Sequence, residues 1–539
     1  MPAVGSRDRV ASKVVFFSCR MRCKINRERG TNRRVSESNP CLKSARSVAK
    51  EQFVKSQPGA HLAHPSFAGE DETRLIRALG DRYRCSEEFL RYYLGEELSA
   101  NPGYFELGSA ALCFGRLPSG VDRVHLATRP QDGASNSPDG RPQVVLPFDP
   151  DEVIDNLRLE RYAGCQLNEF DKALKQVYYR IRHLTNLKLR GYVQRFRAAN
   201  WKKRDFPQWP VDTTVENISE ALLLHLLQMN RLERIPFIWF WPDGAQASVT
   251  ITHDVETLVG RDMCAEVMDL DESYGFRSSF QIIPEGRYAV SPEFLTGFRD
   301  RGFELCVQDF NHDGRLFDDL REFRRRAALI NRFAREHHAR GFRSAVLYRN
   351  PEWFEFLDFS FDMSMPNVAH LDPQRGGCCT VTPYFIGDMV ELPLTTTQDY
   401  TLFHILKQRS VDLWKLQIEI VLAKNGLITL LVHPDYIIEA GLRAVYKHLL
   451  ATLVELRAHK QLWFALPSEI AEWWRKRNRM TIVENNNSWR ITGEGSDRAR
   501  LAFARIVDGR LIYELARENE GDRFSSQAMS RPVTNLSIR

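Results

Sequence analysis

The stretch VTITHDVE, residues 249–256, decides the fold class of this chain. A short apolar run ends there in ionisable side chains. The same arrangement recurs in FELCVQDFNHDG at 303–314, YRNPEW at 348–353 and LLVHPD at 430–435. A β/α barrel places its functional groups at the C-terminal ends of its parallel strands. The pattern therefore predicts an enzyme of this architecture.

The chain between 248 and 432 alternates strand-like and helix-like patterns. Helical periodicity is clearest over 317–339, with apolar residues on one face and Arg on the other, and over 411–424. Alternating strands and helices favour parallel pairing, in an α/β barrel or a doubly wound sheet. The strands are expected at Ser248–Thr252, Ser278–Ile283, Phe303–Val307, Ser344–Tyr348 and Leu427–Val432.

Five segments follow from composition and periodicity. We expect a disordered basic leader at 1–60, a mainly helical N-terminal domain at 61–244, the barrel at 245–477, a small β appendage at 478–518 and a disordered tail at 519–539. Within the N-terminal domain, apolar spacings of 3 or 4 predict helix over 70–98, and 151–200 is expected to be mainly helical. A strand is expected at 144–148.

Charge argues against nucleic-acid binding. The net charge is +6, but residues 1–60 alone carry 14 Lys and Arg against 4 Asp and Glu, so the rest of the chain is slightly acidic. The ten Cys form no metal-type pairs, which favours a reducing compartment. No apolar run reaches the ~18 residues of a membrane span, and no signal peptide is evident. We therefore expect a cytoplasmic protein, and the oligomeric state stays open.

The residue types at the strand ends suit metal-assisted hydrolysis. Such a reaction needs a divalent ion to polarise a carbonyl, a base for the attacking water and an acid for the leaving group. Asp254, Glu256 and His312 can supply the base and the ligands, and His433 can supply the acid. Each is also compatible with a structural role, and only their common position after strand-like runs raises the functional interpretation.

Residues of about 245–475 resemble the polysaccharide deacetylase (NodB-like) family of the glycoside hydrolase/deacetylase superfamily, whose fold is an irregular (β/α)7 barrel. The motif Thr-His-Asp254-Val-Glu256 is similar to the family's Asp-x-Asp. The resemblance makes Asp254 the base and Glu256 a metal ligand. Arg349-Asn-Pro-Glu-Trp353 matches an Arg-x-Pro-x-Trp motif, whose Arg holds the base, and Leu-Leu-Val-His433-Pro matches the motif of the general acid.

The family's His-x-x-x-His motif reads Gln308-x-x-x-His312 here, so His312 is the second implied ligand. The neutral amide of Gln308 binds zinc far more weakly than imidazole. Asp313 or His253 is an alternative donor if the loops differ. Trp353 and Asp362 are candidate substrate-binding residues, although Trp353 can equally pack in a core and Asp362 can cap a turn.

Two functions therefore remain. The leading one is a metal-dependent hydrolase, acting on carbon-nitrogen bonds other than peptide bonds, that removes N-acetyl rather than O-acetyl groups from a glycan, with zinc favoured as the metal. The alternative is a catalytically weakened glycan-binding protein that keeps the deacetylase-like barrel, and Gln308 is its main support. The expected partner is an acetylated saccharide, with no nucleic acid.

Overall fold

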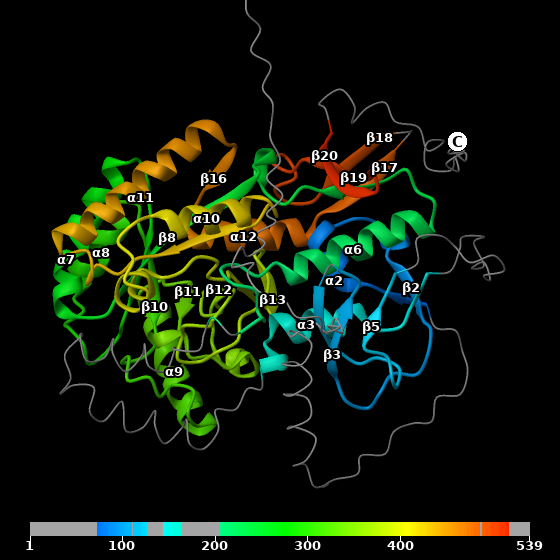
Figure 1. Cartoon of the computed structure of the whole chain (residues 1–539). Coiled ribbons are helices and arrows are strands. Elements are labelled where there is room, and N and C mark those ends of the chain that lie inside the picture. The colour runs from blue at the N-terminus through cyan, green and yellow to red at the C-terminus, as the bar shows by residue number, and fades with distance from the viewer. Residues whose placement is uncertain are drawn as a thin grey trace, which may run out of the picture. The chain divides into compact units, whose positions relative to one another are not determined.

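A mainly parallel, nine-stranded sheet lies at the centre of residues 247–464 (Figure 1). The computed structural model describes residues 73–109, 111–126, 144–163, 202, 204–485 and 488–516. Along the sheet the strands follow the order β13-β14-β12-β11-β10-β9-β8-β15, and β16 also pairs with β8. Only β13 and β14 are antiparallel. The strands are β8 (Ala247–Val255), β9 (Ser279–Ile282), β10 (Glu304–Gln308), β11 (Gly341–Arg343), β12 (Phe361–Asp362), β13 (Tyr384–Ile386), β14 (Met389–Glu391), β15 (Leu427–Leu431) and β16 (Leu462–Phe464).

The β8 strand is buried along all nine residues, as expected of a strand inside a barrel wall. The strand ladder that runs from β14 to β15 does not close on itself. Side-chain hydrogen bonds link the segment after β14 to β15. Thr395 donates to the carbonyl of Leu427 at 2.7 Å, and Thr396 donates to that of Thr429 at 2.8 Å. The predicted α/β class is confirmed, and threonine hydroxyls link the segment after β14 to β15 where the strands themselves do not pair.

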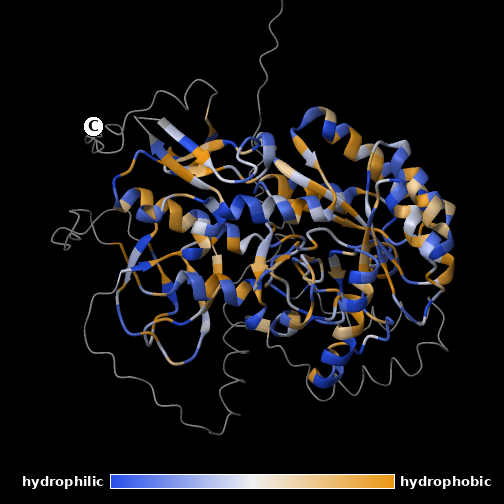
Figure 2. Cartoon of the chain, turned by 180° about the vertical axis from the view of Figure 1, so that it is seen from behind, coloured by the Kyte–Doolittle hydropathy of each residue, from blue (hydrophilic) through white to orange (hydrophobic). Residues whose placement is uncertain are grey.

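Amphipathic helices cover the outside of these strands. In α9, Phe323, Ala327 and Ile330 are buried, and Figure 2 shows apolar and polar residues interleaved along the outer helices. The α9 helix begins where Asp319 accepts a hydrogen bond from the amide of Glu322. The helices are α7 (Leu258–Ser273), α8 (Pro292–Asp300), α9 (Leu320–Glu336), α10 (Asp412–Leu422), α11 (Ala440–His459) and α12 (Pro467–Arg479).

One predicted strand is wrong. Residues 345–347, expected in a strand over 344–348, form a 3-10 turn in which Val346 and Leu347 have positive φ. The strand lies earlier, at β11, and ends at Arg343. A short apolar run fits either structure, and here the parallel pairing of β11 with β10 and β12 fixes the strand. This shift changes which arginine stands at a strand end.

The described residues before the barrel mix short strands with helices. The helix expected over 70–98 covers only α2, because Arg84 takes a left-handed conformation (φ 52) and the following chain forms β2, which pairs with β1 and β6. The elements are β1 (Arg74–Leu75), α2 (Arg77–Tyr83), β2 (Arg91–Leu94), β3 (Gly103–Leu107), β4 (Ala111–Gly115), β5 (Arg123–Val124), β6 (Val145–Leu146), α3 (Pro150–Arg158), α6 (Thr214–Met229) and β7 (Arg234–Ile238).

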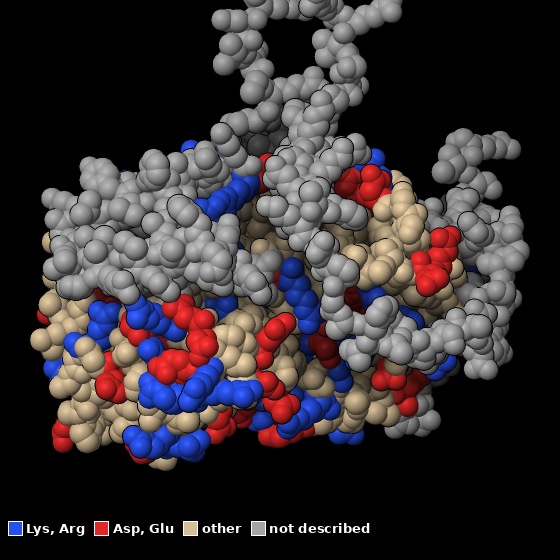
Figure 3. Space-filling view, turned by 90° about the horizontal axis from the view of Figure 1, so that it is seen from below, with Lys and Arg blue, Asp and Glu red and all other residues tan. Residues whose placement is uncertain are grey.

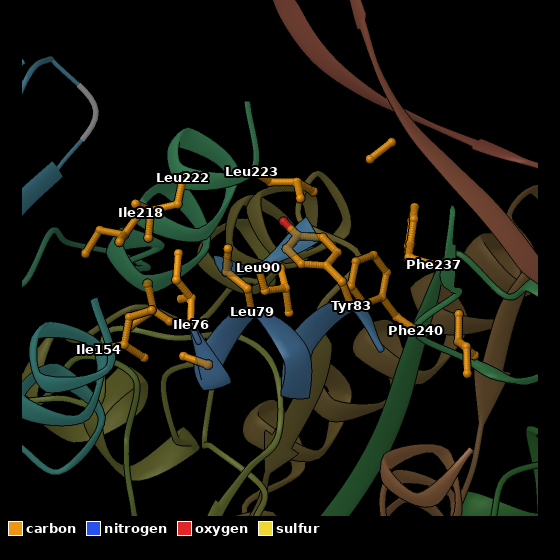
Figure 4. Packing of buried hydrophobic residues seen from close by; sticks show 14 of the residues in the cluster. Ile76, Leu79, Tyr83, Leu90, Ile154, Ile218, Leu222, Leu223, Phe237 and Phe240 are labelled. Atoms are coloured by element: carbon orange, nitrogen blue, oxygen red, sulfur yellow. The ribbon is translucent and has the colours of Figure 1, made fainter. Parts of the chain in front are cut away.

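A hydrophobic core joins this region to the C-terminal strands. Tyr83 packs among Leu79, Leu223, Phe237 and Phe240 (Figure 4). Its hydroxyl lies 2.7 Å from that of Tyr513. The predicted β pattern after 480 is present as β17 (Thr481–Asn485), β18 (Ser488–Thr492), β19 (Leu501–Val507) and β20 (Arg510–Leu515), and β19 pairs with both β20 and β7.

Several sequence expectations lie outside the described residues. They are the leader at 1–60, the tail at 519–539 and most of the helical pattern at 151–200, of which α3 is the described part. The domain boundaries stay predictions. Among the described residues, no helix is both long and apolar enough to cross a membrane. Acidic and basic side chains are interspersed on the described surface that Figure 3 shows.

Candidate functional site

Three polar side chains meet at the C-terminal ends of three strands of the sheet. Asp254 comes from β8, Gln308 ends β10 and Arg343 ends β11. Arg343 Nη1 donates to Asp254 Oδ1 at 2.7 Å, and Gln308 Nε2 donates to Asp254 Oδ2 at 3.0 Å. All three are buried. Both oxygens of this carboxylate are therefore held, which fixes its orientation.

Arg343 performs the contact that was expected of Arg349. Besides Asp254, it donates to Thr252 Oγ1 at 3.0 Å and to the carbonyl of Met363 at 3.0 Å. The guanidinium thus binds two side chains of β8 and the carbonyl of the residue after β12. Because a guanidinium is planar with several fixed donors, these bonds hold it in one orientation.

Arg349 binds the carboxylate of Glu160, so the prediction that it contacts Asp254 is wrong. Its Nε donates to Glu160 Oε2 at 2.8 Å, its Nη2 bonds the other oxygen of Glu160, and its Nη1 donates to the carbonyl of Leu347 at 2.7 Å. Both side chains of this pair are buried. The 3-10 turn after β11 carries the chain away from Asp254. Arg349 therefore links the barrel to the segment that follows α3.

Gln308 directs its amide nitrogen at Asp254. A carboxylate can only accept, so the amide group facing it is the nitrogen, and Gln308 Oε1 is left buried without a hydrogen-bond partner. Only Oε1 of Gln308 could serve as the weak metal ligand that the sequence suggested, because Nε2 already donates to Asp254. The side chain acts here as a hydrogen-bond donor to Asp254.

Glu256, His312 and His433 converge next to this group. Glu256 Oε1 lies 2.9 Å from His312 Nε2 and 3.8 Å from His433 Nε2. The 2.9 Å approach lacks hydrogen-bond alignment, and His312 Nε2 is buried without a hydrogen-bond partner. Arg287 donates to the carbonyl of His312 at 2.6 Å, and His312 has a positive φ of 57. An unusual local backbone conformation thus presents this ring to the carboxylate.

His433 is held by Asp399, a residue that the sequence did not single out. Asp399 Oδ1 lies 2.6 Å from His433 Nδ1, and Asp399 Oδ2 accepts from the backbone amide of His433 at 2.8 Å. Burial lowers the pKa of His433, but the carboxylates of Asp399, Glu256 and Asp254 outweigh it and raise the pKa to about 10. The ring is therefore protonated at neutral pH and can donate a proton from Nε2.

Two of these residues fit a divalent ion by donor type. Imidazole nitrogen and carboxylate oxygen are ordinary ligands of zinc, and the lone pair of an unpartnered, buried His312 Nε2 beside Glu256 suits such an ion. The alternative donors do not complete the set, because His253 points to the other side of β8 and Asp313 binds Arg326 at 2.8 Å. Within the described ranges, no three or more His, Cys, Asp or Glu side chains form a group that could hold a metal.

The two candidate substrate-binding residues have other partners. The ring of Trp353 stacks on Phe317 at a centroid distance of 6.2 Å and lies 5.3 Å from Phe323 of α9. Asp362 accepts from the amide and the hydroxyl of Ser364, both at 2.8 Å. It also neighbours Glu391 across the β12–β14 pair, and burial raises the pKa of both carboxyls. Their substrate-binding roles stay predictions.

One aromatic ring packs next to His433, and two further rings lie next to that ring. Tyr436 lies 5.0 Å from His433 between ring centroids, and it also neighbours Tyr400 at 5.5 Å and His404 at 5.1 Å. His404 belongs to a single π-helical turn, Thr401–Ile405, which begins two residues after Asp399. Such turns occur frequently at functional sites. The sequence signal that could have indicated this segment is the polar run Thr395 to Asp399 after a buried strand.

The comparisons with known proteins find likeness only among solved structures. A provisionally assigned polysaccharide deacetylase from Mycobacterium smegmatis is 18% identical over 46% of this chain and 97% of that one, with a TM-score of 0.35. Puue allantoinase is 12% identical over 44% and 92%, with a TM-score of 0.36. A mutant of the peptidoglycan deacetylase PdaC from Bacillus subtilis is 14% identical over 43% and 93%, with a TM-score of 0.28.

No family model and no curated protein matches the chain. Identities and TM-scores this low transfer neither a reaction nor a residue role. The parallel sheet and the groups at its strand ends are thus described from this chain's own geometry. They define an α/β protein with a fixed carboxylate, an imidazole held by a second carboxylate and a Glu–His pair at one end of its strands.

Proposed function

We propose that this chain is a deacetylase-like hydrolase that removes acetyl groups from a glycan, N-acetyl rather than O-acetyl. The observation that supports this most is that a carboxylate, which can accept a proton, and an imidazole, which can donate one, lie on adjacent strands. Asp254 on β8 is a carboxylate held by Arg343, and His433 after β15 is a protonated imidazole held by Asp399. A hydrolysis needs one group of each kind.

In this proposal, Asp254 accepts a proton from a water molecule as that water attacks the acetyl carbonyl. His433 then gives its Nε2 proton to the amine nitrogen as the carbon–nitrogen bond breaks. The products are acetate and a free amino sugar, and the two proton transfers balance. Arg343 keeps Asp254 oriented, and Asp399 keeps His433 charged and directed towards Glu256.

Glu256 and His312 are the residues that would hold a divalent ion, with zinc favoured. When bound, such an ion supplies a Lewis acid that polarises the acetyl carbonyl. The remaining coordination positions would be filled by water or substrate.

A second candidate function has its own supporting observation. Gln308 occupies one oxygen of Asp254 at 3.0 Å, which competes with a water for that oxygen. A glycan-binding protein with a weakened catalytic site would tolerate this contact. Its ligand would still be a saccharide bound at the same end of the strands.

Elemental analysis and an acetate-release assay separate the two functions. We expect about one zinc-like ion per chain, and acetate release from fully N-acetylated chito-oligosaccharides that is lost in Asp254→Asn. The exposed Asp262, which pairs with Arg261, gives the matched control Asp262→Asn. A parallel pair is His312→Ala, which should lose the ion, and the exposed His338→Ala, which should keep it. Saccharide binding without metal or acetate release would instead favour the glycan-binding protein.

A further inference from the structure

His253 is adjacent in sequence to Asp254, and its ring contacts the residue directly before His433. It directly precedes Asp254 on β8, so its side chain points to the opposite face of the strand. It is completely buried. Its ring lies 4.8 Å from that of Phe280 on β9. The sequence suggested His253 as an alternative metal donor, and its contacts give it a different task.

One ring nitrogen reaches the strand that carries His433. Nδ1 of His253 lies 2.8 Å from the carbonyl of Val432, the residue directly before His433. A carbonyl only accepts, so Nδ1 carries the hydrogen. The last backbone bond between the strands runs from the amide of Val432 to the carbonyl of Thr252 at 3.0 Å. The His253 side chain therefore adds one more link just where Asp254 and His433 leave the ladder.

The other ring nitrogen is anchored to the outer helices. Nε2 of His253 lies 3.0 Å from Asp271 Oδ2 on α7. That same oxygen accepts from Ser278 Oγ at 2.6 Å, and Asp271 Oδ1 accepts from Tyr446 Oη of α11 at 2.5 Å. Asp271, Tyr446 and Ser278 are as buried as the ring. Each oxygen of Asp271 already receives a hydroxyl hydrogen.

These contacts hold the ring in one orientation. Nδ1 faces the carbonyl of Val432 and Nε2 faces the carboxylate of Asp271, so both ring nitrogens have a partner. Breaking either contact would leave buried polar groups without a hydrogen bond, which is costly.

We propose that His253 is a positioning residue that sets the separation of Asp254 and His433. It does so by tying the end of β8 to the end of β15 and by anchoring both to α7 and α11 through Asp271. The roles of Asp254 and His433 rest on the proposed function, whereas the link itself does not.

Imidazole NMR of histidine-labelled protein tests the link without any activity. His253, assigned by the signals lost in His253→Asn, should show a hydrogen on Nδ1, the nitrogen that faces the carbonyl of Val432. In that variant the His433 signals should shift, because its strand end is released. Tyr446→Phe is the matched control, since it removes one donor to Asp271 but keeps the bond to Val432. It should leave the His433 signals in place.

Kinetics give the second measurement. His253→Asn should lower kcat at least tenfold with KM within about twofold, while Tyr446→Phe should keep kcat within about twofold. If His253→Asn does not fold, Asp271→Asn replaces it, since it weakens the anchor and retains the ring. Unchanged His433 signals in a folded variant would overturn the inference. A wild type that releases no acetate would overturn the proposed function alone, because the NMR result still decides the link.

Discussion

Arg343 and Asp254 form a buried ion pair, with Nη1 of the arginine 2.7 Å from Oδ1 of the aspartate, at the ends of two strands that are not neighbours in the sheet. Between these strands lie β10 and β9, and Gln281 of β9 has its Oε1 3.5 Å from the same Nη1. The pair thus links β8 to β11 past the two strands that separate them. It fixes the carboxylate that we propose as the base.

Arg343→Lys should lower kcat/KM about 100-fold, because a single ammonium cannot bind Asp254, Thr252 and the carbonyl of Met363 in the same planar geometry. The measurement is acetate release under steady-state conditions. Arg340→Lys is the control, since Arg340 is exposed three residues earlier. Equal kinetics for both variants would mean that Asp254 needs no support from Arg343.

Arg349→Ala should destabilise the protein rather than alter its chemistry. It leaves the carboxylate of Glu160 buried without its ionic partner, which costs about 3–5 kcal/mol. Urea denaturation measures the free energy of unfolding, and the double variant with Glu160→Ala should lose less than the sum of the single variants. A stable but inactive Arg349→Ala would return Arg349 to the site in which the sequence placed it.

Gln308→His should strengthen zinc binding by at least about tenfold, because imidazole is a much better zinc ligand than an amide. It also removes the donor to Asp254 Oδ2. Calorimetric titration with zinc measures the affinity, and Gln308→Asn, which adds no imidazole, is the control. No gain in affinity would show that residue 308 does not face the ion.

Glu304 should make stability depend on pH. This first residue of β10 accepts from the backbone amide of Ser468 at 3.0 Å, and burial raises its pKa from 4.5 to about 7. The folded state therefore keeps a proton that the unfolded state loses, so stability falls as pH rises from about 4.5 to about 7. The loss is about 2 kcal/mol at most after allowance for partial exposure.

Thermal unfolding followed by circular dichroism between pH 4.5 and 7 checks this expectation. Glu304→Gln can still accept from Ser468, and its Tm should change less with pH than that of the wild type. The exposed Glu266→Gln should retain the dependence of the wild type. Parallel curves for wild type and Glu304→Gln would assign the pH dependence to other groups.

Much of the barrel was predictable because buried parallel strands leave a strong apolar signal. The predicted strands match β8, β9, β10 and β15 to within about three residues at each end, within the usual uncertainty of such boundaries. The short strand β11 was missed because its three residues, Gly341 to Arg343, carry too little pattern. The pairing with β10 and β12 creates this strand, and pairing partners cannot be read from a local window.

The errors at the site also arise because a local sequence pattern does not show which segments pair. Asp254 lies near the end of β8, and Glu256, His312 and His433 follow strands that leave a clear apolar pattern. The structure brings Glu256 close to both histidines. The Pro351 and Trp353 that follow Arg349 make it match the family motif, yet a short-range motif does not reveal where a strand ends. Asp399 was missed because it follows a segment that contacts β15 through threonine hydroxyls, and such side-chain bonds leave no periodic signal.

The pairing of β19 with β7 also constrains how this protein is made. The β7 strand leaves the ribosome just before the barrel, but its partner emerges only after the whole barrel has been synthesised. Until then β7 presents an open strand edge, a feature that promotes aggregation of incomplete chains. Nascent chains stalled before residue 501 should therefore depend on chaperones more than completed ones, although their barrel is already fully translated.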